Sequence, residues 1–181
     1  MNHDLVEVKE SKLNVLIDLK YSSSDNFTKK KILSNQICLI HKIAYEHLEL
    51  AANIAEKLSF TLKIFDAYRP VFVQNKLWEY YPDPNFIVPP SKGSPHSRGI
   101  AIDLTLTNFN GEQLDMGTDF DEFSKLSYHG NLDISEKAYK NRMILLGIMT
   151  DAGWDFFRNE WWHYQLFNSK KYPIIDNFEN Q

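Results

Sequence analysis

Three stretches of the chain repeat apolar residues at intervals of three and four, the spacing of one helix face. The clearest runs from 37 to 58 and predicts a long helix. A shorter helix is expected over 71–80. The third is expected to begin at a capping box formed by Asp133 and Glu136 and to stop at Gly153.

Two other stretches alternate apolar and polar positions, which is typical of strands. Residues 61–68 form the first, and residues 99–106 form the second. In the second strand the isoleucines and leucines share one face, and Asp103 lies on the other face between small or polar neighbours. A carboxylate in the middle of a strand is costly unless it is paired or bound to a cation.

Weaker patterns add short strands. Residues 5–20 are expected to enter the fold as a strand-like segment, and an Asn-Gly turn at 110–111 predicts a hairpin that returns through 113–116. Two closing strands are expected at 154–156 and 162–166. Together the elements predict an α+β fold, with helices packed on one side of a small, mostly antiparallel sheet.

Length and composition limit the class of protein. The 181 residues fit a single domain spanning 1–181, and a net charge of −4 gives no basic footprint for nucleic acid. No apolar run is long enough for a membrane span, so neither nucleic acid nor membrane is expected as a partner. The sequence does not define the oligomeric state.

The remaining features of the chain suggest an intracellular protein. The first residues lack the pattern of a signal peptide, so a cytoplasmic location is expected.

Cys38, the single cysteine, lies in the apolar run of the first predicted helix and is expected to be a buried, inert thiol. The tail from Lys170 is polar and is expected to be peripheral.

Two histidines and two acidic residues are candidates for a metal site. His96 precedes the strand that carries Asp103, and His163 lies in the last predicted strand, three residues after Glu160. Two imidazoles and a carboxylate suit zinc, with a second carboxylate as a base. Taken separately, His96 could be a surface residue and His163 part of an ordinary core strand, so both interpretations stay open.

Other candidate residues also have simpler interpretations. Arg69 stands at a strand end, where it could reach an anionic substrate or an oxyanion, or simply pair with Asp66. Tyr21 lies next to a turn-rich segment and could serve loop packing alone. His41 and His47 are six residues apart on the predicted helix, so they do not form a metal-binding pair at i and i+4.

The combined motifs resemble a known family. Ser94-x-His96-x-x-Gly99-x-Ala101-x-Asp103 followed by Glu160-x-x-His163 resembles the signature of the LAS-type zinc peptidases, which act on D-amino-acid and peptidoglycan peptides. Outer matches resemble its D-alanyl-D-alanine dipeptidase branch, of the VanX type. They are Asp18-Leu19-Lys20-Tyr21, Asp25-Asn26-Phe27, Asp66-Ala67-Tyr68-Arg69-Pro70, Met116-Gly117-Thr118 and Phe120-Asp121. The resemblance spans roughly Leu16 to Leu166.

The resemblance implies a metallopeptidase with one zinc ion per chain. Its zinc ligands would be His96, Asp103 and His163. Glu160 matches the catalytic base, and Arg69 matches the arginine that stabilises the transition state. The implied reaction is hydrolysis of D-alanyl-D-alanine to two D-alanines, so the expected partner is a small dipeptide.

Three further positions match those around the free amino end of the substrate: Tyr21, Ser94 and Asp121. Two alternative functions stay open. The first is a D,D-carboxypeptidase or L-Ala-D-Glu endopeptidase acting on cell-wall peptides, which Tyr21 and Asp121 disfavour. The second is a zinc-stabilised module without catalysis. Glu160 and Arg69 disfavour it, because a structural zinc needs neither and usually has four protein ligands.

Overall fold

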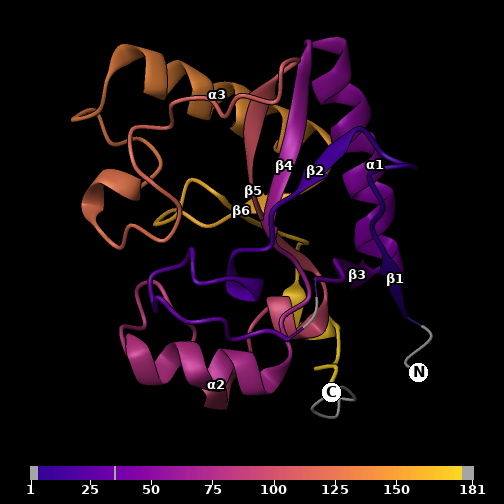
Figure 1. The fold of residues 1–181 in the computed structure, drawn as a ribbon, viewed down its shortest axis with the longest axis vertical. Helices are drawn as coiled ribbons and strands as arrows, with labels where there is room; N and C mark the ends of the chain where they lie inside the picture. Colours follow the sequence, from indigo (N-terminus) through magenta and orange to yellow (C-terminus); the bar gives the residue numbers. More distant parts are fainter. Residues whose placement is uncertain (1–3, 35, 177–181) are drawn as a thin grey trace.

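The computed structural model describes residues 4–34 and 36–176 of the chain, which fold into helices around a mixed sheet (Figure 1). The helices are α1 (Lys42–Lys57), α2 (Val71–Tyr80) and α3 (Glu136–Asp151). The strands are β1 (Leu5–Glu7), β2 (Val15–Ile17), β3 (Leu39–His41), β4 (Phe60–Asp66), β5 (Ala101–Asn108), β6 (Asp155–Phe156) and β7 (His163–Gln165). None of the helices in these residues has the length and apolar character needed to cross a bilayer.

The main sheet has five strands in the order β2-β4-β5-β7-β6. Only β2 and β4 pair in parallel; every other neighbouring pair in this sheet is antiparallel. β1 and β3 form a separate two-stranded antiparallel sheet. The predicted α+β fold with a small, mostly antiparallel sheet is therefore confirmed.

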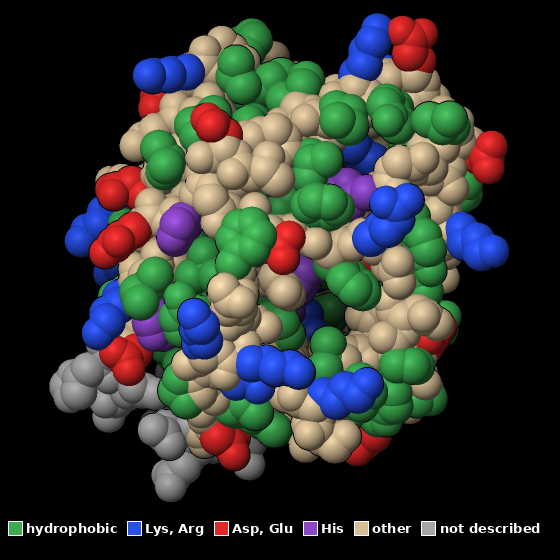
Figure 2. Space-filling view, turned by 180° about the vertical axis from the view of Figure 1, so that it is seen from behind, with side chains coloured by type: hydrophobic (Ala, Val, Ile, Leu, Met, Phe, Trp, Pro, Cys, Tyr) green, Lys and Arg blue, Asp and Glu red, His purple; other side chains and the backbone are tan. Residues whose placement is uncertain are grey.

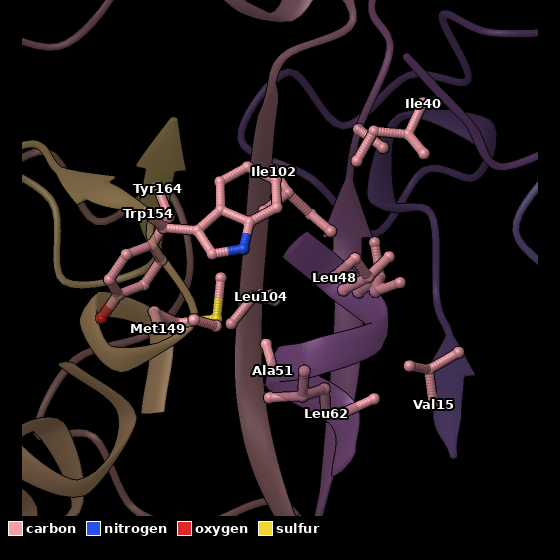
Figure 3. Packing of buried hydrophobic residues seen from close by; sticks show 14 of the residues in the cluster. Val15, Ile40, Leu48, Ala51, Leu62, Ile102, Leu104, Met149, Trp154 and Tyr164 are labelled. Atoms are coloured by element: carbon pink, nitrogen blue, oxygen red, sulfur yellow. The ribbon is translucent and has the colours of Figure 1, made fainter. Parts of the chain in front are cut away.

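The hydrophobic core lies between the sheet and two of the helices. Leu48 and Ala51 of α1 pack toward the central strands, and Met149 of α3 and Trp154 close the other end of the core (Figure 3). α2 does not join them, and Figure 1 shows it well apart from α1 and α3. Its buried apolar residues belong to a second cluster, made of Tyr21, Ile32, Val73, Leu77 and Ile87. The prediction that the helices pack on one side is thus correct for α1 and α3 and wrong for α2.

The first helix begins later than its apolar spacing predicts. Leu39–His41 forms β3, and His41 caps the helix by accepting a hydrogen bond from the Ile43 backbone N–H over 3.2 Å. Ile40 is buried in β3, which pairs with β1, a long-range contact that local spacing does not reveal, whereas Ile37 is 48% exposed. Cys38 therefore lies outside the helix. It is buried as expected, and burial raises its pKa to about 12, so it stays a thiol.

The third helix also differs at its start. Ser135 is the N-cap, and its Oγ accepts a hydrogen bond from the Ala138 backbone N–H over 3.0 Å. The expected capping box of Asp133 and Glu136 is therefore wrong. Gly153, with φ of +87°, follows the helix as predicted, because the left-handed region suits glycine.

The hairpin expected after residues 110–111 is reduced to one bridge, Thr107 to Gln113. Carbonyl groups that a longer strand would pair are already used, because Asp115 O accepts from Asn141 and Met116 O accepts from Arg142, both on α3. The return segment thus leaves the sheet to meet a helix.

Residues 170–176 of the tail are anchored to the fold at Ile175 and are not simply peripheral, which corrects the prediction for the segment from Lys170; the rest of that segment lies outside the described residues. Ile175 is only 3% exposed, and its backbone N–H donates to Ser97 O over 2.8 Å. Its carbonyl accepts from the Tyr68 hydroxyl over 2.6 Å, and Arg98 donates to Tyr172 O. The mostly polar composition of the tail hides these contacts, because all three use only backbone atoms of the tail. The segment from Tyr172 to Ile175, here called the C-terminal strap, therefore crosses the turn that contains His96.

Candidate metal centre and active site

Strand register and one turn bring the three predicted ligands together. Asp103 on β5 is paired with His163 on β7. His96 lies in the 3₁₀ turn before β5, which ends at Gly99 with φ of +69°. A Cβ on Gly99 would also lie 2.8 Å from a methyl carbon of Leu5, so glycine is required there for conformation and for space.

The ligand atoms converge on one point. His96 Nε2 is 3.1 Å from His163 Nδ1 and 3.4 Å from Asp103 Oδ1, and the last two atoms are 3.0 Å apart. A tetrahedral zinc with bonds of about 2.0–2.1 Å separates its ligands by roughly 3.3 Å, so this donor set fits zinc. In the described part of the chain, this is the group of His, Cys, Asp and Glu residues whose ligand atoms lie close enough to hold a metal ion.

Each histidine is held in the tautomer that a metal ligand needs. His96 Nδ1 lies 2.8 Å from Ala67 O, so it donates its proton there and leaves Nε2 free to face the centre. His163 Nε2 lies 3.1 Å from Gln165 Oε1, which leaves Nδ1 free. The sequence analysis missed Gln165. The signal was present, because a residue two positions along a strand shares the face of His163.

Glu160 lies beside this centre and does not belong to the converging set. Its Oε2 is 3.9 Å from His163 Nδ1. Burial, followed by the charges of Asp103 and Asp121, holds the pKa of Glu160 well above its usual range, and Arg69 acts in the other direction. A cation bound at the centre would also favour the ionised form. The carboxyl group is therefore placed for proton transfer.

Arg69 forms the ion pair with Asp66 that the sequence offered as its simpler interpretation, and it also lines the pocket. Its Nε and Nη2 atoms lie 2.8 and 2.7 Å from Asp66 Oδ2, and Nη1 donates to Gln74 Oε1 over 2.8 Å. Its Nη2 is also 3.5 Å from Asp103 Oδ2, and its guanidinium lies over the Tyr21 ring at 5.2 Å. The ion pair with Asp66 thus holds the guanidinium at the pocket. Gln74, on α2, gave no signal in the sequence.

Tyr21 and Asp121 meet across the fold. The Tyr21 hydroxyl donates to Asp121 Oδ2 over 3.0 Å. Enclosure of the Asp121 carboxyl and the nearby charge of Asp103 hold its pKa well above the usual range. Asp121 has φ of +59°, an uncommon conformation for a residue other than glycine. Ser94 is buried, and its hydroxyl accepts from the His96 backbone N–H over 3.2 Å.

One cavity of about 210 Å³ joins all eight candidate residues. They are Tyr21, Arg69, Ser94, His96, Asp103, Asp121, Glu160 and His163. The cavity is smaller than the roughly 300–1,000 Å³ of pockets for drug-sized ligands, so it suits a small substrate. Its apolar wall was missed, because most of these residues lie in loops, where no periodic pattern marks them, and come from distant parts of the chain: Leu77, Pro84, Phe86, Ile87, Phe123, Phe157 and Trp162.

The surface view agrees with this mixed lining. Figure 2 shows a hollow near the middle of one face, with hydrophobic side chains around it and with histidine and acidic side chains at its edge. An apolar wall with a few convergent polar groups is the usual composition of a small-molecule site.

The mostly antiparallel sheet, the buried His-Asp-His donor set and the adjacent glutamate define a metal-dependent hydrolase. A family model described as peptidase M15, D-ala-D-ala dipeptidase, matches residues 1–180. The chain therefore belongs to this family of metallo-dipeptidases, as the motifs predict.

Curated relatives support the same assignment. A D-alanyl-D-alanine dipeptidase from Escherichia coli (strain K12) is 42% identical over 159 residues, which cover 88% of this chain and 82% of the relative. A D-alanyl-D-alanine dipeptidase from Enterococcus faecium is 36% identical over 178 residues, with 86% and 87% coverage. One from Enterococcus faecalis (strain ATCC 700802 / V583) is 32% identical over 186 residues, with 90% of each chain covered.

Proposed function

We propose that this metallo-dipeptidase hydrolyses D-alanyl-D-alanine with one zinc ion per chain, which His96, Asp103 and His163 would hold. The main support is the convergence of their three ligand atoms, 3.0–3.4 Å apart, inside the small pocket. When bound, zinc supplies a water of lowered pKa, about 7, and polarises the scissile carbonyl.

Glu160 is the general base in this proposal. It takes a proton from the attacking water and returns it to the leaving amine of the second D-alanine. Its place 3.9 Å from a ligand nitrogen supports this role, as does a pKa raised by burial, because the group must both accept and release a proton.

Arg69 stabilises the negative charge that develops on the carbonyl oxygen. Asp66 and Gln74 hold the guanidinium from behind, so its orientation is set before the substrate binds. Gln74 also donates to Val88 O over 2.7 Å, which connects this group to the wall of the pocket. Preorganisation of this kind avoids the cost of reorienting a charge during the reaction.

The charge balance of the site supports a substrate with a free ammonium group. Three carboxyl groups line the pocket, from Asp103, Asp121 and Glu160, and the one guanidinium that the described residues contribute to its lining, Arg69, is already paired with Asp66. A divalent ion and an ammonium group would offset this excess. We assign the ammonium to Asp121, with Tyr21 and Ser94 as neutral partners. A longer or blocked peptide would place an uncharged amide against Asp121 and bind poorly.

The test is release of D-alanine by the purified protein from free D-alanyl-D-alanine and from the N-acetylated dipeptide. The proposal predicts release from the free dipeptide alone, abolished by a chelator and restored by zinc. Equal release from the blocked peptide would favour a carboxypeptidase. No release from either substrate by the zinc-loaded protein would favour an endopeptidase or a non-catalytic module.

The single domain over 1–181 and the cytoplasmic location remain predictions.

A further inference from the structure

Arg142, on α3, is a buried residue that does not line the pocket. Its Nε donates to Met116 O over 2.6 Å, and its Nη1 donates to Leu126 O and Tyr128 O over 2.8 and 3.3 Å. Its Nη2 lies 3.5 Å from Thr118 Oγ1. Two of these contacts are near the start of one long loop, and two are near its end.

This segment, residues 116–128, is here called the Asp121 loop. Asp121 lies near its middle with a positive φ, and Phe123 from the same loop forms part of the pocket wall. The position of the Asp121 carboxyl therefore depends on how the two ends of the loop are held. Gly117 fits closely against the start of α3 and the segment before it, since a Cβ there would lie 3.1 Å from Ala138 of the helix and 3.0 Å from Ile134.

The guanidinium is not used as an ordinary ion pair. Within residues 4–34 and 36–176, its hydrogen-bond partners are carbonyl oxygens and one hydroxyl, and none is a carboxylate. Burial lowers the pKa of Arg142 to about 10, against the charges of Asp115 and Glu122. A buried charge is costly, and here the cost is offset by hydrogen bonds to loop carbonyl groups, which would lose this donor if an apolar side chain replaced the arginine.

The same loop is joined to the segment that carries Glu160. The Trp161 backbone N–H donates to Ser127 O over 3.0 Å, and its indole N–H donates to Thr118 Oγ1 over 2.8 Å. The Arg142 guanidinium lies over the Trp161 ring at 5.8 Å. One cation therefore contacts both the Asp121 loop and the neighbour of Glu160.

We infer that Arg142 is a positioning residue for the dipeptidase reaction: by tying both ends of the Asp121 loop together and against Trp161, it sets the place of Asp121 relative to Glu160. The distance and orientation of Asp121 relative to Glu160 fix where the substrate's ammonium group lies when Glu160 faces the scissile bond. The inference rests on the proposed function, because it takes Asp121 as the partner of the free amino end.

The test compares Arg142→Lys, which keeps the charge and loses the planar fork of donors, with the wild type. Arg158→Lys is the matched control, because Arg158 is exposed. We expect the KM of Arg142→Lys for D-alanyl-D-alanine to rise roughly tenfold or more, while kcat changes less. The preference for the free over the N-acetylated dipeptide should fall by a similar factor. Zinc content should stay unchanged, because no metal ligand lies on the loop.

Two results would overturn the inference. One is an Arg142→Lys protein with wild-type KM and preference. The other is a lowered melting temperature with unchanged KM and preference in the remaining active protein, which would make Arg142 purely structural. If Arg142→Lys does not fold, Thr118→Val decides by the same KM and preference criteria, since it removes the hydroxyl shared by Arg142 and Trp161. The wild-type assay tests the proposed function, and the variant-to-wild-type ratio tests this inference.

Discussion

Asp103 of β5 and His163 of β7 lie opposite each other in antiparallel register, and their ligand atoms are 3.0 Å apart. They are 60 residues apart in the sequence. Pairing of the two strands sets their separation, and His96 completes the set from the turn just before β5. The candidate metal centre is thus built on the central strands of the sheet, where the backbone is held on both sides.

Replacing the proposed base should separate metal binding from catalysis. Glu160→Gln should keep its zinc, because Glu160 is outside the converging ligand set, and kcat should fall by about 10² or more. Metal analysis and steady-state kinetics measure the two effects. Glu79→Gln, an exposed glutamate on α2, is the control. Near-normal kcat in zinc-loaded Glu160→Gln would remove Glu160 from this role.

Gln165 should support zinc affinity through His163. Gln165→Leu removes the acceptor for His163 Nε2 and should weaken zinc binding by about 10–100-fold. Gln165→Glu keeps an acceptor and should bind zinc close to normally. Competition with a chelator of known affinity measures both, with exposed Gln113→Leu as the control. Equal affinity in the leucine and glutamate variants would show that the hydrogen bond does not matter.

His129 should make stability depend on pH. Burial, with the charges of Arg142 and Arg158, lowers its pKa from 6.5 to about 4. The unfolded chain therefore takes up this proton first as the pH falls. The part of the free energy of unfolding that depends on neutral His129 is fully present above about pH 6.5. It is lost as the pH falls toward 4, by up to roughly 3 kcal/mol. Urea unfolding of chelated wild type and His129→Gln should show a smaller loss on acidification in the variant. Parallel pH profiles would contradict this.

The C-terminal strap should support the turn that carries His96. Ile175→Ala should lower the free energy of unfolding by about 2–4 kcal/mol, because Ile175 is buried. It should also weaken zinc binding, since the Ile175 backbone is bonded to Ser97. Ile174→Ala is a close control, because Ile174 is 42% exposed. Denaturant unfolding and zinc competition measure both effects, and equal values for the two variants would argue against a role for the strap.

The sequence predicts the metal site well because the site follows local patterns. Alternation along residues 99–106 places Asp103 on one face of a strand, and the short closing strand supplies His163. The dipeptidase motifs then connect Tyr21 and Asp121, which are 100 residues apart in sequence and joined by one hydrogen bond in the fold.

The features that sequence reasoning missed depend on contacts between distant segments. β3 resembles the start of a helix until its pairing with β1 is known. The C-terminal strap was missed because it lies in a tail that is mostly polar from Lys170 on, and because its three bonds use backbone atoms of Tyr172 and Ile175. Arg142 lies on a helix with no local mark of its role, because its partners are carbonyl groups of distant residues. Gln74 is only five residues from its partner Arg69, but no sequence pattern marks that contact.

The most direct test is a zinc titration of the chelated protein, with D-alanine release from D-alanyl-D-alanine as the readout. The account predicts no activity in the chelated protein, a linear rise with added zinc, and a break at one zinc per chain. Asp103→Ala should show no such rise, because one of the three ligands is gone. Activity without zinc, a break at two zinc ions per chain, or full recovery in Asp103→Ala would contradict a single catalytic zinc held by His96, Asp103 and His163.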